Sequence, residues 1–257
     1  EWEKLNWKRN WFRTIALQRS AALVVPSLTL EKIAKQVWHQ PAEKIYRFPN
    51  GVDVHRYEKK PQRGSFPGYV RRDGEIVVGT IAGLRAVKNL PRLVRAVAAA
   101  GPNYRLAIAG EGPEREAILA EAQRLGIADR LMMPGFLKDP ARFVGLFDIF
   151  ALSSDSEQYP ISLVEAMAAA RPVVATKVGD VAAMVSRENR RFIVERHDEA
   201  GFAAALREIG GSVELRTELA HANYARALAE YGEAEMLARY QQLYGATMRR
   251  ADFARQD

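Results

Sequence analysis

Residues 76–101 read IVVGTIAGLRAVKNLPRLVRAVAAAG, and this stretch decides the fold. It begins with the apolar run Ile76–Gly83, which is typical of a strand buried on both faces of a parallel sheet. Asn89 can cap the helix that follows, and Gly101 can end it. A buried strand followed by a capped helix predicts one βα unit of an α/β domain.

The same alternation of strand and helix patterns runs through most of the chain. Pro113 can open a helix that ends at Gly126, and Pro160 precedes a helix that runs to Ala170. Because alternating strands and helices form right-handed βαβ units, we expect a Rossmann-like parallel sheet with helices on both faces. The other predicted strands are Ala22–Pro26, Lys44–Phe48, Arg105–Ala109, Leu131–Met133, Ile149–Leu152, Pro172–Thr176 and Phe192–Glu195.

Composition divides the chain into four parts. Residues 58–74 are polar and rich in proline and glycine, as linkers are. Residues 1–57 hold two short strands and two helices, which is too little for an independent core. Residues 75–231 form a complete α/β domain. Residues 232–257 form one amphipathic helix, which we expect to pack back toward the N-terminal segment.

Charge and cysteine content restrict the classes of partner. The chain has 257 residues, with 38 Lys and Arg against 31 Asp and Glu, so its net charge is +7. A basic balance favours an anionic partner such as a phosphorylated metabolite. Cysteine is absent and the four histidines are far apart, which excludes disulfides and thiolate metal sites and is typical of a reducing cytosol.

The ends and the hydropathy of the sequence bear on its location. No run of 18 apolar residues is present, and the first residues lack an apolar signal core. We therefore expect a cytoplasmic location, with the inner face of the membrane as an alternative. The chain begins with Glu1 and not with Met, which suggests that it starts within a longer protein.

Polar and charged residues follow the predicted strands of the central domain. Arg85 and Lys88 come after the first strand, and residues 153–160 follow another with hydroxyls and carboxylates. In an open parallel sheet these positions meet at the edge where ligands bind. Arg and Lys pair with phosphate, and a helix that begins near Pro160 offers free N–H groups. Singly, each feature also fits a solvated loop charge or a tight turn; together they predict a site for a phosphorylated sugar or nucleotide.

Six short motifs follow one another along the chain. They are PNGVD at 49–53, LRAVKNL at 84–90, GEGP at 110–113, PGF at 134–136, EQYPISLVEAMA at 157–168, and RPVVAT at 171–176 with VGD at 178–180. This ordered set resembles the retaining glycosyltransferases of family four, which have the two-domain GT-B fold. The resemblance covers residues 15–245 and implies the donor-binding C-terminal half of such an enzyme, with a remnant of its N-terminal domain.

The resemblance implies a role for each matching residue. Lys88 matches the lysine that neutralises the donor diphosphate, and Glu157 matches the catalytic-site carboxylate that contacts the transferred sugar. Glu165 matches the carboxylate that holds the ribose hydroxyls. The backbone of Tyr159, Pro160 and Ile161 matches the segment that faces the diphosphate, and the turn with Gly135, Phe136 and Leu137 matches the wall beside the base. No cofactor and no metal are expected, because the nucleotide sugar is the substrate and the leaving diphosphate is stabilised by fixed charges.

Two positions depart from the family pattern. Gly83 stands where the family usually has Arg, and Arg85, two residues later, is a candidate to bind the same phosphate. Gln158 stands where the family usually has Gly, so a side chain can narrow the sugar pocket. Both departures bear on which donor is bound.

The family's acceptor domain usually supplies a glycine-rich loop and a His, and no residue here matches either. We therefore expect the chain to bind a nucleotide sugar without transferring the sugar by itself, the acceptor of the whole enzyme being a sugar or a lipid-linked sugar. A non-catalytic nucleotide-sugar-binding module and a nucleotide-sugar epimerase are the alternatives. A nucleic-acid partner is not expected, since basic and aromatic residues interleave only in residues 1–13. That N-terminal patch can pack on a further domain, contact a membrane surface or promote self-association.

Overall fold

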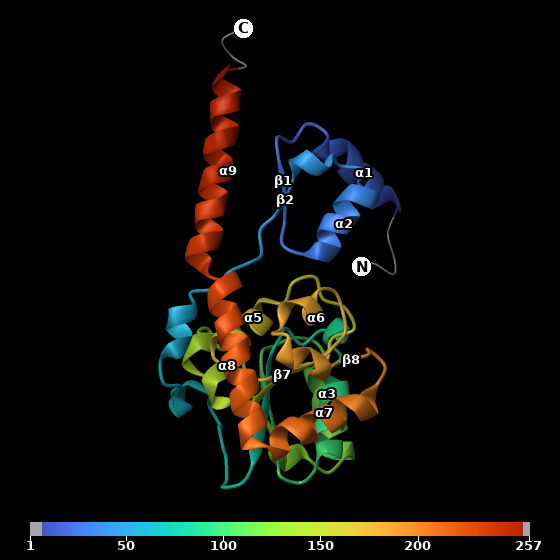
Figure 1. The fold of residues 1–257 in the computed structure, drawn as a ribbon. Helices are drawn as coiled ribbons and strands as arrows, with labels where there is room; N and C mark the ends of the chain where they lie inside the picture. The colour runs from blue at the N-terminus through green and yellow to red at the C-terminus, as the bar shows by residue number, and fades with distance from the viewer. Residues whose placement is uncertain (1–6, 254–257) are drawn as a thin grey trace. The chain divides into compact units, whose positions relative to one another are not determined.

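The computed structural model describes residues 7–253 of the chain, and the side chains of residues 7–248. The chain forms two compact units (Figure 1). The first consists of the residues up to Gly51 together with those from Glu230 onward, and the second is Val52–Ala229. Residues 1–6 and 254–257, which include the start of the N-terminal patch and the end of the predicted last helix, lie outside the described residues.

The second unit is built on a six-stranded parallel sheet with the strand order β5-β4-β3-β6-β7-β8. The chain runs outward from the central strand β3 to β5 and then returns to the centre to begin β6. This is the order of a doubly wound Rossmann-like sheet, as predicted, with its switch point between β3 and β6. The strands are β3 (Ile76–Ile81), β4 (Tyr104–Ala109), β5 (Leu131–Gly135), β6 (Ile149–Leu152), β7 (Val173–Thr176) and β8 (Ile193–Val194).

Helices cover both faces of this sheet because each strand is apolar on both sides. On one face α3 packs against α7 (Figure 1) and against α4, and Leu93, Leu106 and Phe202 are fully buried in the core between these helices and the strands. On the other face α5 packs on β6 and β7. The helices are α3 (Leu90–Ala100), α4 (Arg115–Arg124), α5 (Ile161–Ala168), α6 (Val181–Met184), α7 (Glu199–Gly211) and α8 (Val213–Glu230).

The stretch before β3 belongs to this unit, although its composition resembles a linker. Phe66 is 1% exposed, and its ring centroid lies 5.7 Å from that of Phe143 and 6.0 Å from that of Phe147. Two short 3-10 turns, η3 (Val54–Glu58) and η4 (Arg63–Ser65), lead up to it. The structure thus differs from the predicted division, which began the domain at residue 75, because the anchoring aromatic is a single residue within a polar stretch.

The first unit contains α1 (Trp7–Leu17), β1 (Leu23–Val25), α2 (Leu28–Gln36), β2 (Ile45–Arg47) and α9 (Glu233–Phe253). β1 and β2 pair in parallel. The Ser27 hydroxyl caps α2 by accepting a hydrogen bond from the N–H of Leu30 at 3.0 Å. Trp38 lies in the small core of this unit, where its Nε1 donates to Oδ1 of Asn10 at 3.0 Å.

Helix α9 contacts the segment that follows β2. The ring centroids of Phe48 and Tyr240 lie 5.1 Å apart, and the N–H of Gly51 points at the sulfur of Met236 at 3.2 Å.

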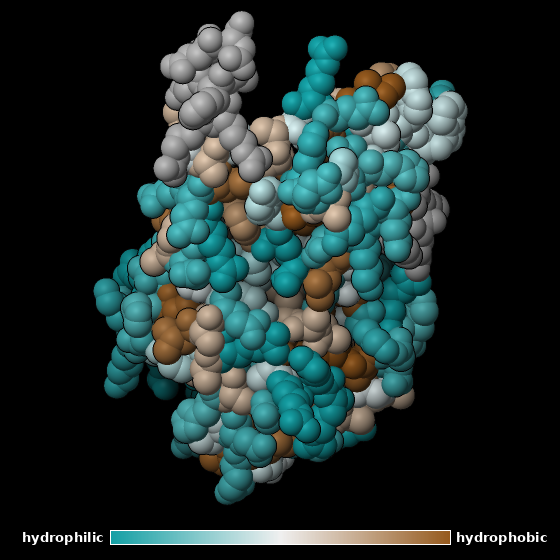
Figure 2. All heavy atoms as spheres, turned by 45° about the horizontal axis from the view of Figure 1, so that its top comes forward, coloured by the Kyte–Doolittle hydropathy of each residue, from teal (hydrophilic) through white to brown (hydrophobic). Residues whose placement is uncertain are grey.

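On the face of the molecule in Figure 2, hydrophobic residues form small separate groups among hydrophilic ones. Among the described residues, no helix is both long and apolar enough to cross a membrane.

Candidate functional site

The candidate site lies at the carboxyl ends of the strands in the second unit. We call the loops there the rim, and they comprise residues 82–89, 110–114, 135–139, 153–160 and 177–180. Neighbouring loops of the rim are held together by hydrogen bonds between backbone groups. These bonds are Leu84 N–H to Glu111 O (2.8 Å), Gly110 N–H to Gly135 O (2.8 Å) and Asp155 N–H to Val87 O (2.8 Å).

Two glycines allow the loops after β3 and β4 to approach so closely. Gly110 and Gly112 have φ values of +147° and +152°, which L side chains rarely adopt. A Cβ at Gly110 would collide with the carbonyl of Ala82, and one at Gly112 would collide with that of Leu84. The GEGP motif is therefore required for the shape of the rim, whether or not it touches a ligand.

Lys88 and Glu157 meet at the switch point. Nζ of Lys88 lies 2.6 Å from Oε1 of Glu157, although 69 residues separate them in the sequence. Ser154 donates to the same carboxylate oxygen at 2.6 Å. The side chain of Glu157 is 8% exposed and that of Lys88 is 25% exposed, so the cation is the more accessible partner. A phosphate that reached Lys88 would compete with Glu157 for its ammonium group.

The loops that bear this pair are joined by side chains as well as by backbone. Asn89 adopts a left-handed conformation (φ +43°) and caps α3, as predicted, and its Nδ2 donates to Oδ2 of Asp155 at 3.1 Å. The Ser153 hydroxyl lies 3.0 Å from the carbonyl oxygen of Lys88 and 3.1 Å from that of Asn89. Lys88 and Glu157 therefore sit on two loops that are fixed to each other.

Arg92, in the first turn of α3, braces the second of these loops from inside the domain. It is 5% exposed, and its Nη1 donates to the carbonyl oxygen of Ser153 at 3.0 Å. Its Nη2 pairs with Oδ1 of Asp155 at 2.8 Å. Because Asp155 is two residues from Glu157, this buried cation stabilises the loop conformation that presents the carboxylate.

Arg85 projects from the loop after β3 and is exposed. A Cβ at Gly83 would lie 3.7 Å from Nε of Arg85. Nε of the Arg85 guanidinium thus lies beside position 83, where the family has its arginine. This geometry supports the hypothesis that Arg85 replaces that residue.

Tyr159, Pro160 and Ile161 form the entry to α5. Pro160 is buried at the N-cap position and its carbonyl oxygen accepts from the N–H of Leu163 at 3.1 Å, while Ile161 begins the helix and is 48% exposed. The first N–H groups of a helix have no partner within it, so this end can interact with an anion.

Glu165 is also on α5, but its contact is with a different element. Its Oε1 accepts a hydrogen bond from the Tyr57 hydroxyl at 3.0 Å. Burial raises the pKa of the Glu165 carboxyl above its ordinary value, although the bond from Tyr57 acts in the opposite direction. Within the part of the chain that the structure describes, no hydrogen bond or ion pair joins Glu165 directly to Lys88 or Glu157.

The predicted base wall is a turn supported by a carboxylate. Gly135 has a φ of +95° and is buried, Leu137 is half-buried, and Phe136 is 69% exposed. The N–H of Phe136 donates to Oε1 of Glu111 at 3.3 Å. The exposed Phe136 ring is free to stack on a planar group.

The structure adds two residues that sequence reasoning missed, Tyr57 and Arg92, and it gives contacts for Ser154 and Asp155 of the predicted loop 153–160. Tyr57 and Arg92 lie outside the six motifs, and their contacts bridge elements that are distant in the sequence. Within residues 7–253, no group of three or more His, Asp or Glu side chains could hold a metal ion.

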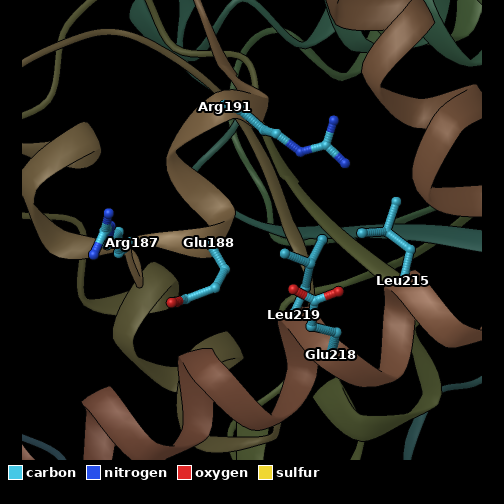
Figure 3. A pocket seen from close by; sticks show the side chains of 6 residues that line it. All are labelled: Arg187, Glu188, Arg191, Leu215, Glu218 and Leu219. Carbon is cyan, nitrogen blue, oxygen red and sulfur yellow. The ribbon is translucent and has the colours of Figure 1, made fainter.

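A cavity of about 330 Å³ lies elsewhere in the second unit. Figure 3 shows Arg187, Glu188 and Arg191 around the turn η9 (Glu188–Phe192) and Leu215, Glu218 and Leu219 on α8. Because η9 leads into the amino end of β8, this cavity lies toward the amino ends of the strands, whereas the rim lies at their carboxyl ends. It contains none of the predicted site residues.

A family model described as "Glycosyl transferases group 1" matches residues 63–226, which is more than half of the chain. The chain belongs to this family. The predicted family is thereby confirmed, and so is the expectation of a transferase with a Rossmann-like sheet. The match begins before β3 and includes Phe66, in agreement with the extent of the second unit.

The curated relatives that the chain matches are longer than the chain itself. N-acetyl-alpha-D-glucosaminyl L-malate synthase of Bacillus anthracis is 24% identical over 212 residues, which are 82% of this chain and 56% of the relative. D-inositol 3-phosphate glycosyltransferase of Segniliparus rotundus is 28% identical over 203 residues, which are 75% of this chain and 45% of the relative. The chain thus spans about half the length of the curated relatives it matches.

Solved structures match this chain as one half of a GT-B fold. Anabaena Alr3699/HepE in complex with UDP superimposes with a TM-score of 0.85 at 19% identity, covering 96% of this chain and 70% of that chain. The same Anabaena protein with UDP-glucose gives a TM-score of 0.84. Sucrose-phosphate synthase from Thermosynechococcus elongatus gives 0.83 at 20% identity, over 96% of this chain and 63% of that one. At these identities the likeness is one of fold.

Proposed function

We propose that the chain is the donor-binding half of a retaining glycosyltransferase and binds a nucleoside-diphosphate sugar at the rim. The observation that carries this proposal is the Lys88–Glu157 pair at the switch point, where open α/β sheets bind their ligands. Retention rests on the resemblance of the ordered motifs to family four. The resemblance also supplies the roles of Glu165 at the ribose and of the Gly135–Leu137 turn at the base.

The chemistry follows from the charges of the pair. In the proposed complex the donor diphosphate takes the ammonium of Lys88, with Arg85 as a second cation, and the N–H groups at the start of α5 add to the same field. Glu157, released from Lys88, accepts hydrogen bonds from hydroxyls of the transferred sugar. As the bond to the sugar breaks, negative charge grows on the leaving diphosphate, and fixed cations stabilise it without reorganising.

UDP is the first nucleotide to test, because the Anabaena structural neighbour binds UDP and UDP-glucose. The proposed acceptor of the whole enzyme is a sugar or a lipid-linked sugar. Transfer by the chain alone is not expected, since the family's acceptor-side loop and histidine have no match in it. No cofactor is proposed.

Titration calorimetry of the 257-residue chain with UDP, GDP and ADP tests donor binding. We expect one of the three to bind, and Lys88→Ala to weaken that binding by about 10- to 100-fold, because a charge-assisted hydrogen bond contributes about 1.5–3 kcal/mol. Lys35→Ala is the matched control, since Lys35 forms a Lys–Glu pair of the same 2.6 Å length with Glu31 in the other unit. Equal affinities of the two variants would refute the proposed phosphate role of Lys88.

A transfer assay separates donor binding from catalysis. With the donor that binds and simple sugar acceptors, the chain alone should give no product, whereas a longer protein with its acceptor domain should form a bond with the donor's anomeric configuration, read by NMR. An inverted product would exclude retention. Binding without transfer in the longer protein would favour the non-catalytic binding module.

A further inference from the structure

The 3-10 turn η3 (Val54–Glu58) is held at three points by consecutive residues. Nη2 of Arg56 pairs with Oδ1 of Asp139 at 3.0 Å, in the loop that follows β5. The Tyr57 hydroxyl donates to Glu165 on α5 at 3.0 Å. Glu58 accepts from the hydroxyl of Tyr224, on α8, at 2.6 Å. Such a turn has one fixed position relative to α5, and all of these residues belong to the second unit.

The middle contact involves the carboxylate proposed to bind ribose. Tyr57 and Glu165 are both half-buried. Burial raises the pKa of the Tyr57 phenol far above its ordinary value, and the neighbouring Glu165 charge acts in the same direction. The phenol therefore stays protonated and acts as a donor to the carboxylate. One carboxylate oxygen, Oε1, is occupied by this bond, and the other is left for a ligand.

We propose that Tyr57 is a positioning residue for nucleotide recognition: by holding Oε1 of Glu165 it orients the second oxygen toward the ribose hydroxyls. The inference rests on the proposed ribose role of Glu165. A glutamate side chain has several rotamers of similar energy, and a hydrogen bond from a fixed turn selects one of them before the ligand arrives. The expected consequence is sharper discrimination between ribose and 2′-deoxyribose, with little effect on the diphosphate.

The test compares ribonucleotides with their 2′-deoxy forms. Calorimetry with UDP and dUDP, GDP and dGDP, and ADP and dADP gives, for the pair that binds tightest, the ratio of the deoxy Kd to the ribo Kd. We expect this ratio to be about tenfold in the wild type, since one hydrogen bond to a charged group corresponds to that factor or more. Glu165→Gln should bring the ratio near one, and Tyr57→Phe should bring it to about three.

Tyr224→Phe is the matched control. It removes another hydroxyl-to-carboxylate bond of the same turn but leaves Glu165 untouched. Its ratio should equal that of the wild type. If Tyr224→Phe and Tyr57→Phe lower the ratio equally, the effect comes from loosening the turn and the positioning role of Tyr57 is refuted. Thermal melts confirm that each variant is folded before its ratio is used.

The double variant Tyr57→Phe/Glu165→Gln completes the design. If Tyr57 acts through Glu165, its removal changes nothing further once Glu165 is gone. An unchanged ratio in Glu165→Gln would refute the ribose role in the proposed function, whereas a lowered ratio there with an unchanged ratio in Tyr57→Phe would refute the inference alone. If none of the nucleotides binds, both fail.

Discussion

The two compact units of the chain differ in how completely they bury their aromatic residues. In the second unit six phenylalanines are fully buried around a six-stranded sheet: Phe66, Phe143, Phe147, Phe150, Phe192 and Phe202. In the first unit the sheet has two strands, and α1 leaves Trp7, Trp11 and Phe12 between 57% and 72% exposed. A two-stranded sheet with a small core is marginal by itself, whereas a doubly wound sheet covers both of its own faces. The proposed chemistry lies in the unit that completes its core.

The largest expected effect concerns residues 58–74, which belong to the second unit although their composition resembles a linker. Phe66→Ala should destabilise the second unit by about 3–5 kcal/mol, because the buried Phe66 ring packs against both Phe143 and Phe147. Urea unfolding followed by far-UV circular dichroism measures the loss. Leu228→Ala, at a 47% exposed position of α8, is the control and should change stability little. A loss below 1 kcal/mol at Phe66 would mean that residues 58–74 act as the linker their composition suggests.

A smaller effect is expected inside the rim. Arg92→Met should lower the free energy of unfolding by about 1–3 kcal/mol, since it leaves the carbonyl of Ser153 without its buried donor and removes the ion-pair partner of Asp155. It should also weaken nucleotide binding by about tenfold, because the loop with Glu157 loses its brace. Calorimetry and urea unfolding give the two quantities.

Arg95→Met is the control for that variant. Arg95 pairs with Glu199 and Glu121, and within residues 7–253 no hydrogen bond or ion pair joins it to Ser153, Asp155 or Glu157. Arg95→Met should lower the free energy of unfolding without weakening nucleotide binding. Equal binding losses in the two variants would show that Arg92 acts only through the general stability of α3.

The sheet could be predicted from the sequence because its strands are short apolar runs with unambiguous flanks. Each predicted strand has a counterpart, and Asn89 caps α3 as expected. The domain boundary could not be predicted from the sequence in this way, since one buried residue, Phe66, attaches the polar stretch around it to the second unit. The hydrophobic pattern of a sequence predicts its strands and helices, whereas a domain boundary can depend on the long-range contacts of a single residue.

One contact between candidate site residues was predictable in the same way. The meeting of Lys88 with Glu157 follows from the order of β3 and β6, since both residues come just after neighbouring strands. Tyr57 could not be assigned, because it lies in a turn before the sheet begins and reaches Glu165 across 108 residues. Arg92 is an ordinary charged residue in the sequence, and only its burial distinguishes it, whereas Asp155 is distinguished by its pairing with Arg92.

The smallest expected effect belongs to the first unit. Residues 1–51 hold nine basic and four acidic residues, and α1 presents its exposed aromatic rings among Lys8, Arg9 and Arg13. Such a face should promote weak self-association, which sedimentation velocity detects as a coefficient that rises with concentration. Trp11→Ser should weaken that association by about tenfold, because one ring supplies much of the apolar area. Nucleotide affinity should stay unchanged, since the rim is built from the second unit alone, and a loss of affinity in Trp11→Ser would contradict this. A strictly monomeric wild type would mean that repulsion between the basic charges of α1 outweighs the attraction between its exposed rings.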